Sequence, residues 1–303
     1  MVKKMESNAQ KQVSQYKEDQ RDKGRLLISC PDQPGIVASV SDFLYKQGAN
    51  ILESSQYSTD TNAGTFFMRI EFECPELNKK ENKLKEDFQS IANQFKMKWE
   101  IIFAYHIKRT ALFVSKELHC LRELLWEWQS GDLMTDISLV ISNHEDAKEI
   151  VESLQIPFYY IPVSKETKKE AEEKQRELLN QYQIDLIVLA RYMQILSPSF
   201  VKDYENKIIN IHHSFLPAFM GARPYERAFA RGVKLIGATS HYVTDDLDEG
   251  PIIEQDIMRV NHQDDVQQLK KIGQSIERNV LSRAVKWHLQ DKIIVQGNKT
   301  IIF

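Results

Sequence analysis

Short, almost uninterrupted apolar runs that alternate with helical patterns constrain the second part of this chain most strongly. The clearest run is I-D-L-I-V-L-A at 184–190, and three others share its character: 111–114, 136–141 and 158–162. Strands that are apolar on both faces belong in a parallel sheet with helices on each side. The helices are expected at 117–129, 145–154, 168–182 and 265–290. The sequence therefore predicts an α/β domain with a mostly parallel sheet, and an edge hairpin at 292–303.

A different pattern organises residues 24–104, where the elements follow the order β-α-β-β-α-β. In the strand expected at 65–74 the apolar side chains alternate with Arg69, Glu71 and Glu73, which is typical of a half-buried antiparallel strand. The first helix follows a turn at 30–35, and its expected core residues are Ile36, Val37, Val40, Phe43 and Leu44. This order of elements predicts a ferredoxin-like fold.

The remaining segments are polar. Residues 1–23 are rich in glutamine and charge, so we expect either a solvated tail or a frayed helix there. Residues 105–109 form a short linker, and the second domain occupies 110–303.

Composition excludes several classes of protein. The chain has 303 residues, 27% of them charged, and a net charge of −3, which argues against a nucleic-acid-binding surface. The three cysteines are odd in number and far apart, as in a reducing cytoplasm rather than a disulfide framework. No apolar run approaches the roughly 18 residues that a membrane span needs, and the polar N-terminus does not resemble a signal peptide. We therefore expect a cytoplasmic protein that binds neither nucleic acid nor membrane.

Polar groups that can carry chemistry gather in two stretches, N-I-H-H-S-F-L-P at 210–217 and G-A-T-S-H-Y-V-T-D-D-L-D-E-G-P at 237–251. Asn210 and His212 are two apart, so on an extended segment they share one face. A carboxamide can stabilise an oxyanion, an imidazole can transfer protons, and a carboxylate such as Asp248 can hold the imidazole or a water. From the residues alone, a structural histidine, a capping asparagine and a solvated acidic run remain open as alternatives.

Other chemistries lack their motifs. The sequence contains no nucleophile elbow G-x-S-x-G, no H-E-x-x-H, no Walker lysine loop and no G-x-G-x-x-G after the first strand. The strand at 111–114 is followed by S-K-E-L-H-C, without glycine, which disfavours a phosphate cradle. No set of residues has metal-ligand spacing, so we expect no metal and no cofactor.

The turn D-Q-P-G-I-V at 32–37 and the G-A-N-I at 48–51 resemble the ACT domain, a small regulatory module. This resemblance implies an amino-acid effector, glycine or methionine, at an interface between paired modules, and a homo-oligomer, either a dimer or a tetramer. The implied effector contacts are Asp32, Gly35, Ile36, Val37 and Asn50. Gly35 would let the backbone approach a ligand, and the helix start would offer N–H groups to a carboxylate. A tight turn that serves only dimerisation is the alternative.

Residues 110–303 resemble the folate-dependent formyltransferase fold, a Rossmann-like domain. The resemblance rests on the asparagine–histidine motif at 210–217, the aspartate loop T-D-D-L-D-E-G-P-I-I at 244–253 and L-A-R-Y-M-Q-I-L-S-P at 189–198. Carried over by position, it implies that Asn210, His212 and Asp248 are catalytic. His213 stands where many relatives carry proline, so the resemblance implies His212 rather than His213 as the proton carrier.

The same resemblance implies a pterin pocket that is lined by the segment 189–198 and faced by the acidic loop. Arg191 is a candidate for the folate glutamate tail, and Arg223 and Tyr225 for stabilising the loop on the acceptor side. The implied substrate-binding residues are Tyr192, Met193, Gln194, Ile195, Leu196, Gly221, His241 and Asp245.

The ACT-like unit and the missing glycine loop distinguish this chain from formyltransferases that act on glycinamide ribonucleotide. The combination, with S-F-L-P-A-F and G-A-R-P-Y, resembles the formyltetrahydrofolate deformylase family along almost the full length. It implies that water accepts the formyl group of 10-formyltetrahydrofolate, giving formate and tetrahydrofolate and balancing one-carbon pools for purine synthesis. Formyl transfer to an amine and folate sensing without turnover are the alternatives.

Overall fold

The computed structural model describes residues 8–60, 64–218 and 223–303, which form two compact units. The small unit consists of Lys11–Ile107 with Asp291–Ile294 and Ile301–Phe303. The large unit contains Lys108–Gln290 and Val295–Thr300, together with Asn8–Gln10. In the described part of the chain no helix is both long and apolar enough to cross a membrane.

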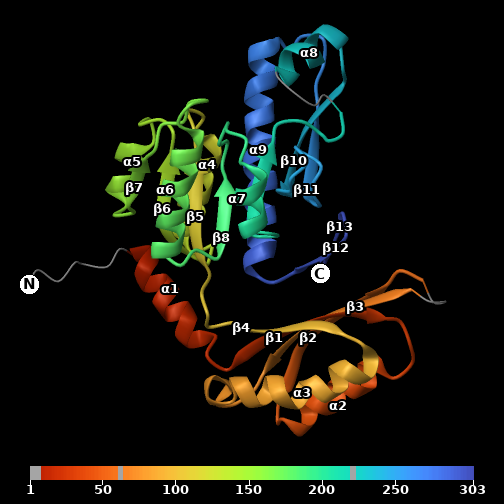
Figure 1. Cartoon of the computed structure of the whole chain (residues 1–303). Coiled ribbons are helices and arrows are strands. Elements are labelled where there is room, and N and C mark those ends of the chain that lie inside the picture. Colours follow the sequence, from red (N-terminus) through yellow and green to blue (C-terminus); the bar gives the residue numbers. More distant parts are fainter. Residues whose placement is uncertain (1–7, 61–63, 219–222) are drawn as a thin grey trace, which may run out of the picture. The chain divides into compact units, whose positions relative to one another are not determined.

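The small unit has the predicted ferredoxin-like order. Helix α1 (Asn8–Asp19) precedes it, where a polar tail or a frayed helix was expected. Its elements are β1 (Lys23–Pro31), α2 (Ile36–Lys46), β2 (Asn50–Ser58), β3 (Thr65–Glu73), η1 (Leu77–Lys79), α3 (Glu81–Phe95) and β4 (Lys98–Phe103). The strands form an antiparallel sheet in the order β2-β3-β1-β4, and α2 and α3 lie on the same face of it (Figure 1).

Two predictions about the core of this unit are wrong. Val37 was expected inside, but its side chain is 39% exposed, because the buried stripe of α2 runs through Ile36, Val40 and Leu44. Strand β3 was expected to be half-buried, yet Arg69 is only 1% exposed. Burial of Arg69 is possible because its guanidinium contacts Glu53 at 2.9 Å and Glu71 at 2.8 Å, which compensates the buried charge.

The large unit is built on a seven-stranded sheet in the order β11-β10-β9-β8-β5-β6-β7. Strands β5 to β9 are parallel to one another, whereas β10 is antiparallel to both of its neighbours, β9 and β11. This confirms the mostly parallel sheet that the apolar runs predict. The strands are β5 (Arg109–Val114), β6 (Asp136–Ser142), β7 (Phe158–Tyr160), β8 (Leu186–Leu189), β9 (Ile208–His212), β10 (Leu235–Tyr242) and β11 (Ile252–Arg259).

Helices cover both faces of this sheet. Helices α6 and α7 share a buried apolar cluster with Phe113 and Ile141, whereas α9 packs against β9, β10, β11 and α4 (Figure 1). The expected C-terminal hairpin is present as β12 (Ile293–Gln296) and β13 (Lys299–Ile302). The helices are α4 (His119–Ser130), α5 (Lys148–Ser153), α6 (Lys168–Gln181), α7 (Pro198–Asp203), α8 (Pro224–Arg231) and α9 (Val266–Leu289).

Gly273 lets helix α8 pack closely on α9. A Cβ atom at this position would lie 2.0 Å from the hydroxyl oxygen of Tyr225, which is itself buried. We expect Gly273→Ala to lower the free energy of unfolding by about 1–3 kcal/mol, because overpacking outweighs the better helix propensity of alanine. Urea unfolding measures this effect, and Asn279→Ala at an exposed position of α9 is the control. An unchanged or raised stability of Gly273→Ala would contradict this packing.

Candidate active site

Two neighbouring strands bring three polar side chains together. Strand β9 carries Asn210 and His212, which share one face because side chains alternate along a strand. In β10, His241 is the cross-strand partner of Asn210. Directly opposed residues of antiparallel strands have neighbouring side chains. The predicted relation between Asn210 and His212 is therefore present, and His241 joins them.

Asp248 returns to these strands from the loop between β10 and β11. Its Oδ2 lies 3.1 Å from His212 Nδ1, and its Oδ1 lies 3.6 Å from His241 Nε2. Asp248 has a φ of 59°, in the left-handed region. Two residues later, the backbone of Gly250 packs so tightly on Tyr242 that a Cβ atom at Gly250 would lie 1.8 Å from the Tyr242 carbonyl oxygen. The backbone of this loop is thus held in an uncommon conformation that aims Asp248 at the strands.

The environment of Asp248 keeps its carboxyl group ionised. Burial raises its pKa, but the hydrogen bond from His212 outweighs this effect, so the pKa lies well below the usual value. A carboxylate can only accept, so His212 Nδ1 carries the proton of their hydrogen bond. His212 Nε2 is buried and has no hydrogen-bond partner among the described residues. In the neutral imidazole this nitrogen is free to accept a proton.

His241 orients the side-chain amide of Asn210. His241 Nδ1 lies 2.9 Å from the Tyr242 carbonyl oxygen, which can only accept, so Nδ1 is protonated. In the neutral ring Nε2 then accepts from Asn210 Nδ2 at 3.2 Å. One N–H of the Asn210 amide is used in this way, and its second N–H remains available as a donor.

All these groups line one cavity of about 480 Å³, a volume that suits a small organic molecule. Asn210, His212 and Asp248 lie on its wall. Gly221 was also predicted to bind substrate, but it lies outside the described residues. The predicted substrate-binding residues that line the cavity are Tyr192, Met193, Gln194, Ile195, Leu196, His241 and Asp245.

These lining residues are not equivalent. Met193 and Ile195 are exposed to 56% and 62%, so they offer apolar surface to a ligand. Tyr192 is buried, and its hydroxyl accepts a hydrogen bond from Gln175 at 3.0 Å, so it mainly supports the wall. Sequence reasoning missed Leu247, which is 61% exposed on the acidic loop and lines the same cavity. An apolar residue between four acidic ones was the signal for it.

His213 stacks beside His212, with ring centroids 5.2 Å apart. Burial and the neighbouring Arg191 and His212 lower its pKa from 6.5 to about 4. His213 is therefore uncharged near neutral pH, whereas the unfolded chain takes up a proton there below pH 6.5.

This depressed pKa predicts a pH dependence of stability. Above pH 6.5 His213 is neutral in both states and contributes nothing, and between pH 6.5 and about 4 protonation favours the unfolded chain. We expect the free energy of unfolding to fall less over this window in His213→Gln than in the wild type. Urea unfolding at several pH values tests this, with the exposed His262→Gln as control. Equal pH slopes in both proteins would contradict it.

One group of potential metal ligands occurs in the described part of the chain: His119, Cys120 and Glu277, whose donor atoms lie within 4.8 Å of one another. His119 Nε2 is already bonded to Glu277 at 2.7 Å. Burial raises the pKa of the Cys120 thiol well above its ordinary value, which disfavours the thiolate that a metal needs. The Arg191 guanidinium, 3.4 Å from Glu277, further opposes a second cation. We therefore assign no metal to this group.

Comparisons with known proteins match both units. The model of the family described as "Formyl transferase" matches residues 108–285, and that of the ACT domain matches residues 24–89. A formyltetrahydrofolate deformylase of Bacillus subtilis is 61% identical over 299 residues, which is 99% of this chain and 100% of that protein. The chain belongs to the formyltetrahydrofolate deformylase family. The resemblance to an ACT domain and a formyltransferase domain is confirmed with it.

Solved structures agree with this family assignment. A formyltetrahydrofolate deformylase of Pseudomonas syringae has a TM-score of 0.88 at 47% identity, and the match covers 93% of this chain and 94% of that one. A glycinamide ribonucleotide transformylase of Symbiobacterium toebii has a TM-score of 0.61 at 27% identity, covering 65% of this chain and 95% of that one. The transformylase therefore matches about two thirds of this chain, whereas the deformylase matches almost all of it.

Four of the five predicted effector residues of the ACT domain, Asp32, Gly35, Ile36 and Val37, lie around the start of α2. Asn50 does not lie with them: it follows the end of this helix, at the opposite end of the sheet. Gly35 has a φ of 95°, which favours glycine, and it directly precedes this helix. Asp32 accepts a hydrogen bond from the Ser58 hydroxyl at 2.5 Å, and Asn50 begins the exposed strand β2. Ile36 is buried and Val37 is partly exposed. Effector binding by these residues stays a prediction.

Proposed function

We propose that this protein hydrolyses 10-formyltetrahydrofolate to formate and tetrahydrofolate, with Asn210, His212 and Asp248 as the catalytic residues. One observation supports this proposal above the others. His212 uses Nδ1 to bond a buried carboxylate and leaves Nε2 without a partner among the described residues, in a cavity that Asn210 also lines. An imidazole base that is oriented by a carboxylate and lies near an amide donor is suited to acyl transfer to water.

In the first step a water attacks the formyl carbon. Asp248 holds His212, and His212 Nε2 takes the proton of the water as its oxygen bonds to this carbon. The free N–H of Asn210 then donates to the oxyanion of the tetrahedral intermediate. Because His241 already holds the amide, this donor needs no reorganisation when the charge develops.

In the second step the carbon–nitrogen bond breaks. The proton on His212 Nε2 passes to the departing folate nitrogen, which leaves as the secondary amine of tetrahydrofolate. Formic acid loses its remaining proton to solvent near neutral pH, so the products are tetrahydrofolate, formate and one proton. His213 is uncharged at this pH and is not needed as a proton carrier.

The folate would bind between the exposed side chains of Met193 and Ile195 and the acidic loop that carries Asp245 and Leu247. The folate is the substrate, and the mechanism calls on no further cofactor. The ACT domain supports regulation by an amino acid, glycine or methionine, within a homo-oligomer. Formate release of this kind would balance one-carbon pools for purine synthesis in the cytoplasm.

The test is formate release from 10-formyltetrahydrofolate with and without amine acceptors, including glycinamide ribonucleotide. Steady formate production without an acceptor is the expected result. Turnover that appears only with an amine would instead assign formyl transfer, the alternative that the transformylase fold favours. Folate binding without either reaction would indicate a sensor and overturn the proposal.

A further inference from the structure

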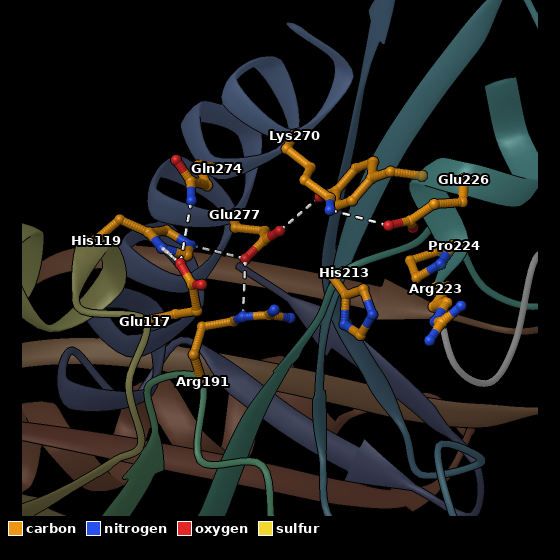
Figure 2. A pocket seen from close by; sticks show the side chains of 11 residues that line it. Glu117, His119, Arg191, His213, Arg223, Pro224, Glu226, Lys270, Gln274 and Glu277 are labelled. Atoms are coloured by element: carbon orange, nitrogen blue, oxygen red, sulfur yellow. Dashed lines mark hydrogen bonds and ion pairs between the residues drawn. The ribbon is translucent and has the colours of Figure 1, made fainter. Parts of the chain in front are cut away.

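A second cavity, of about 260 Å³, is shown in Figure 2. Arg191, His213 and Arg223 line both cavities. The other residues of the second cavity come from the start of α4, from α8 and from α9: Glu117, His119, Pro224, Tyr225, Glu226, Lys270, Gln274 and Glu277. The second cavity is therefore more strongly charged than the first and meets it at Arg191.

Glu277 is a fixed anion in this second cavity. Its side chain is 1% exposed and accepts hydrogen bonds from His119 Nε2 at 2.7 Å and from the Tyr225 hydroxyl at 2.6 Å. Burial raises the pKa of Glu277, but these bonds and the charge of Arg191 outweigh it and lower the pKa. Figure 2 shows His119 and Arg191 converging on this carboxylate.

Arg191 has donor capacity that Glu277 does not use. Only its Nε approaches Glu277, at 3.4 Å, while Nη1 is buried and has no hydrogen-bond partner among the described residues. The backbone of Arg191 is held at a φ of 66°, and its carbonyl oxygen accepts from the Ser115 N–H at 3.3 Å. A buried guanidinium with a free N–H lacks an acceptor that a ligand could supply.

We propose that Arg191 binds the formate that the reaction releases, and that the second cavity is the route by which formate leaves. This inference rests on the proposed hydrolysis. Formate is a small carboxylate, and a guanidinium fork is the side-chain group that matches carboxylate geometry best. Arg191 lines the same cavity as His212 and Asp248, so formate would form in a cavity that Arg191 borders.

Electrostatics favours movement of formate from the catalytic residues to Arg191, where the two cavities meet. Asp248 stays ionised, so a newly formed formate is repelled from the catalytic residues. Arg191 and Arg223 lie where the two cavities meet, and the uncharged His213 between them adds no opposing charge. The bulky tetrahydrofolate can remain in the first cavity while formate passes into the second. A cavity of about 260 Å³ holds formate together with several waters.

Product inhibition by formate tests this inference on the full-length enzyme. We expect Arg191→Gln to raise the formate inhibition constant by about tenfold or more, because a charge-assisted hydrogen bond is lost. Glu277→Gln should lower the same constant, because it removes the anion that competes for Arg191. Lys270→Gln is the matched control: Lys270 also lines the second cavity, but it pairs with Glu226 at 2.9 Å and is half exposed.

The two variants change formate affinity in opposite directions, which a general loss of structure cannot do. Line broadening of carbon-13-labelled formate by the folate-free enzyme gives a second, direct measurement. An unchanged formate constant in a folded Arg191→Gln, or a wild type that formate does not inhibit, would overturn the inference. A raised KM for the folate with an unchanged formate constant would instead assign Arg191 to the folate. A wild type that releases no formate at all would overturn the hydrolase proposal itself.

Discussion

Asp248→Asn should lower kcat by a factor on the order of 10³–10⁴ while leaving the fold and the KM for the folate nearly unchanged. Asp248 accepts from His212 Nδ1 at 3.1 Å, and this bond places the ring proton on Nδ1. An asparagine amide can donate to Nδ1 instead, which moves the ring proton to Nε2. His212 could then no longer take the proton of the attacking water.

The matched control is Asp246→Asn, two positions away in the same loop. Asp246 is exposed and is not among the residues that line the catalytic cavity. Single-turnover measurements of formate release at saturating folate separate the chemical step from binding. A loss of less than about tenfold in Asp248→Asn would show that His212 does not depend on this carboxylate for its tautomer.

The sequence was sufficient for the parts of the site that follow from periodicity and motif. Asn210 and His212 lie on one face of β9 because strand side chains alternate. The long helix α9 ends within one residue of its predicted bounds, since its apolar stripe has a clear helical period. The acidic loop reaches the cavity wall as expected, because β10 and β11 form a hairpin next to β9.

The positions of partners across strands could not be predicted in this way. That His241 faces Asn210 depends on the register between β9 and β10, which no local pattern specifies. Likewise, Asp248 reaches His212 through a left-handed backbone conformation, and such conformations are expected at glycine rather than aspartate.

Buried charges were the main failure of reasoning from pattern. Arg69 was assigned to the solvent side of its strand because charged residues are rarely buried. It is buried because Glu53 and Glu71 meet it from neighbouring positions of the sheet. Glu277 was missed for the same reason, since its partners His119, Tyr225 and Arg191 come from three distant segments. Only tertiary structure brings such compensating charges together.

Asn210→Ala should lower kcat by a factor of about 10²–10³, because it removes one donor to the oxyanion that forms only during the reaction. The KM for the folate should change little, since the formyl oxygen carries less charge in the ground state. The protein should remain folded: Asn210 makes one side-chain hydrogen bond among the described contacts, to His241 Nε2 at 3.2 Å. Thermal unfolding and steady-state formate release measure both effects.

Asn180→Ala, at an exposed position of α6, is the control for the loss of an amide elsewhere. His241→Gln gives an independent check of how the amide is held. Loss of the imidazole frees the Asn210 amide to rotate, so kcat should fall in this variant too, but by less than in Asn210→Ala. If Asn210→Ala raised KM and left kcat unchanged, the amide would act in folate binding. If His241→Gln were more damaging than Asn210→Ala, the imidazole would have a catalytic role of its own, and the oxyanion donor would have to be sought elsewhere in the cavity.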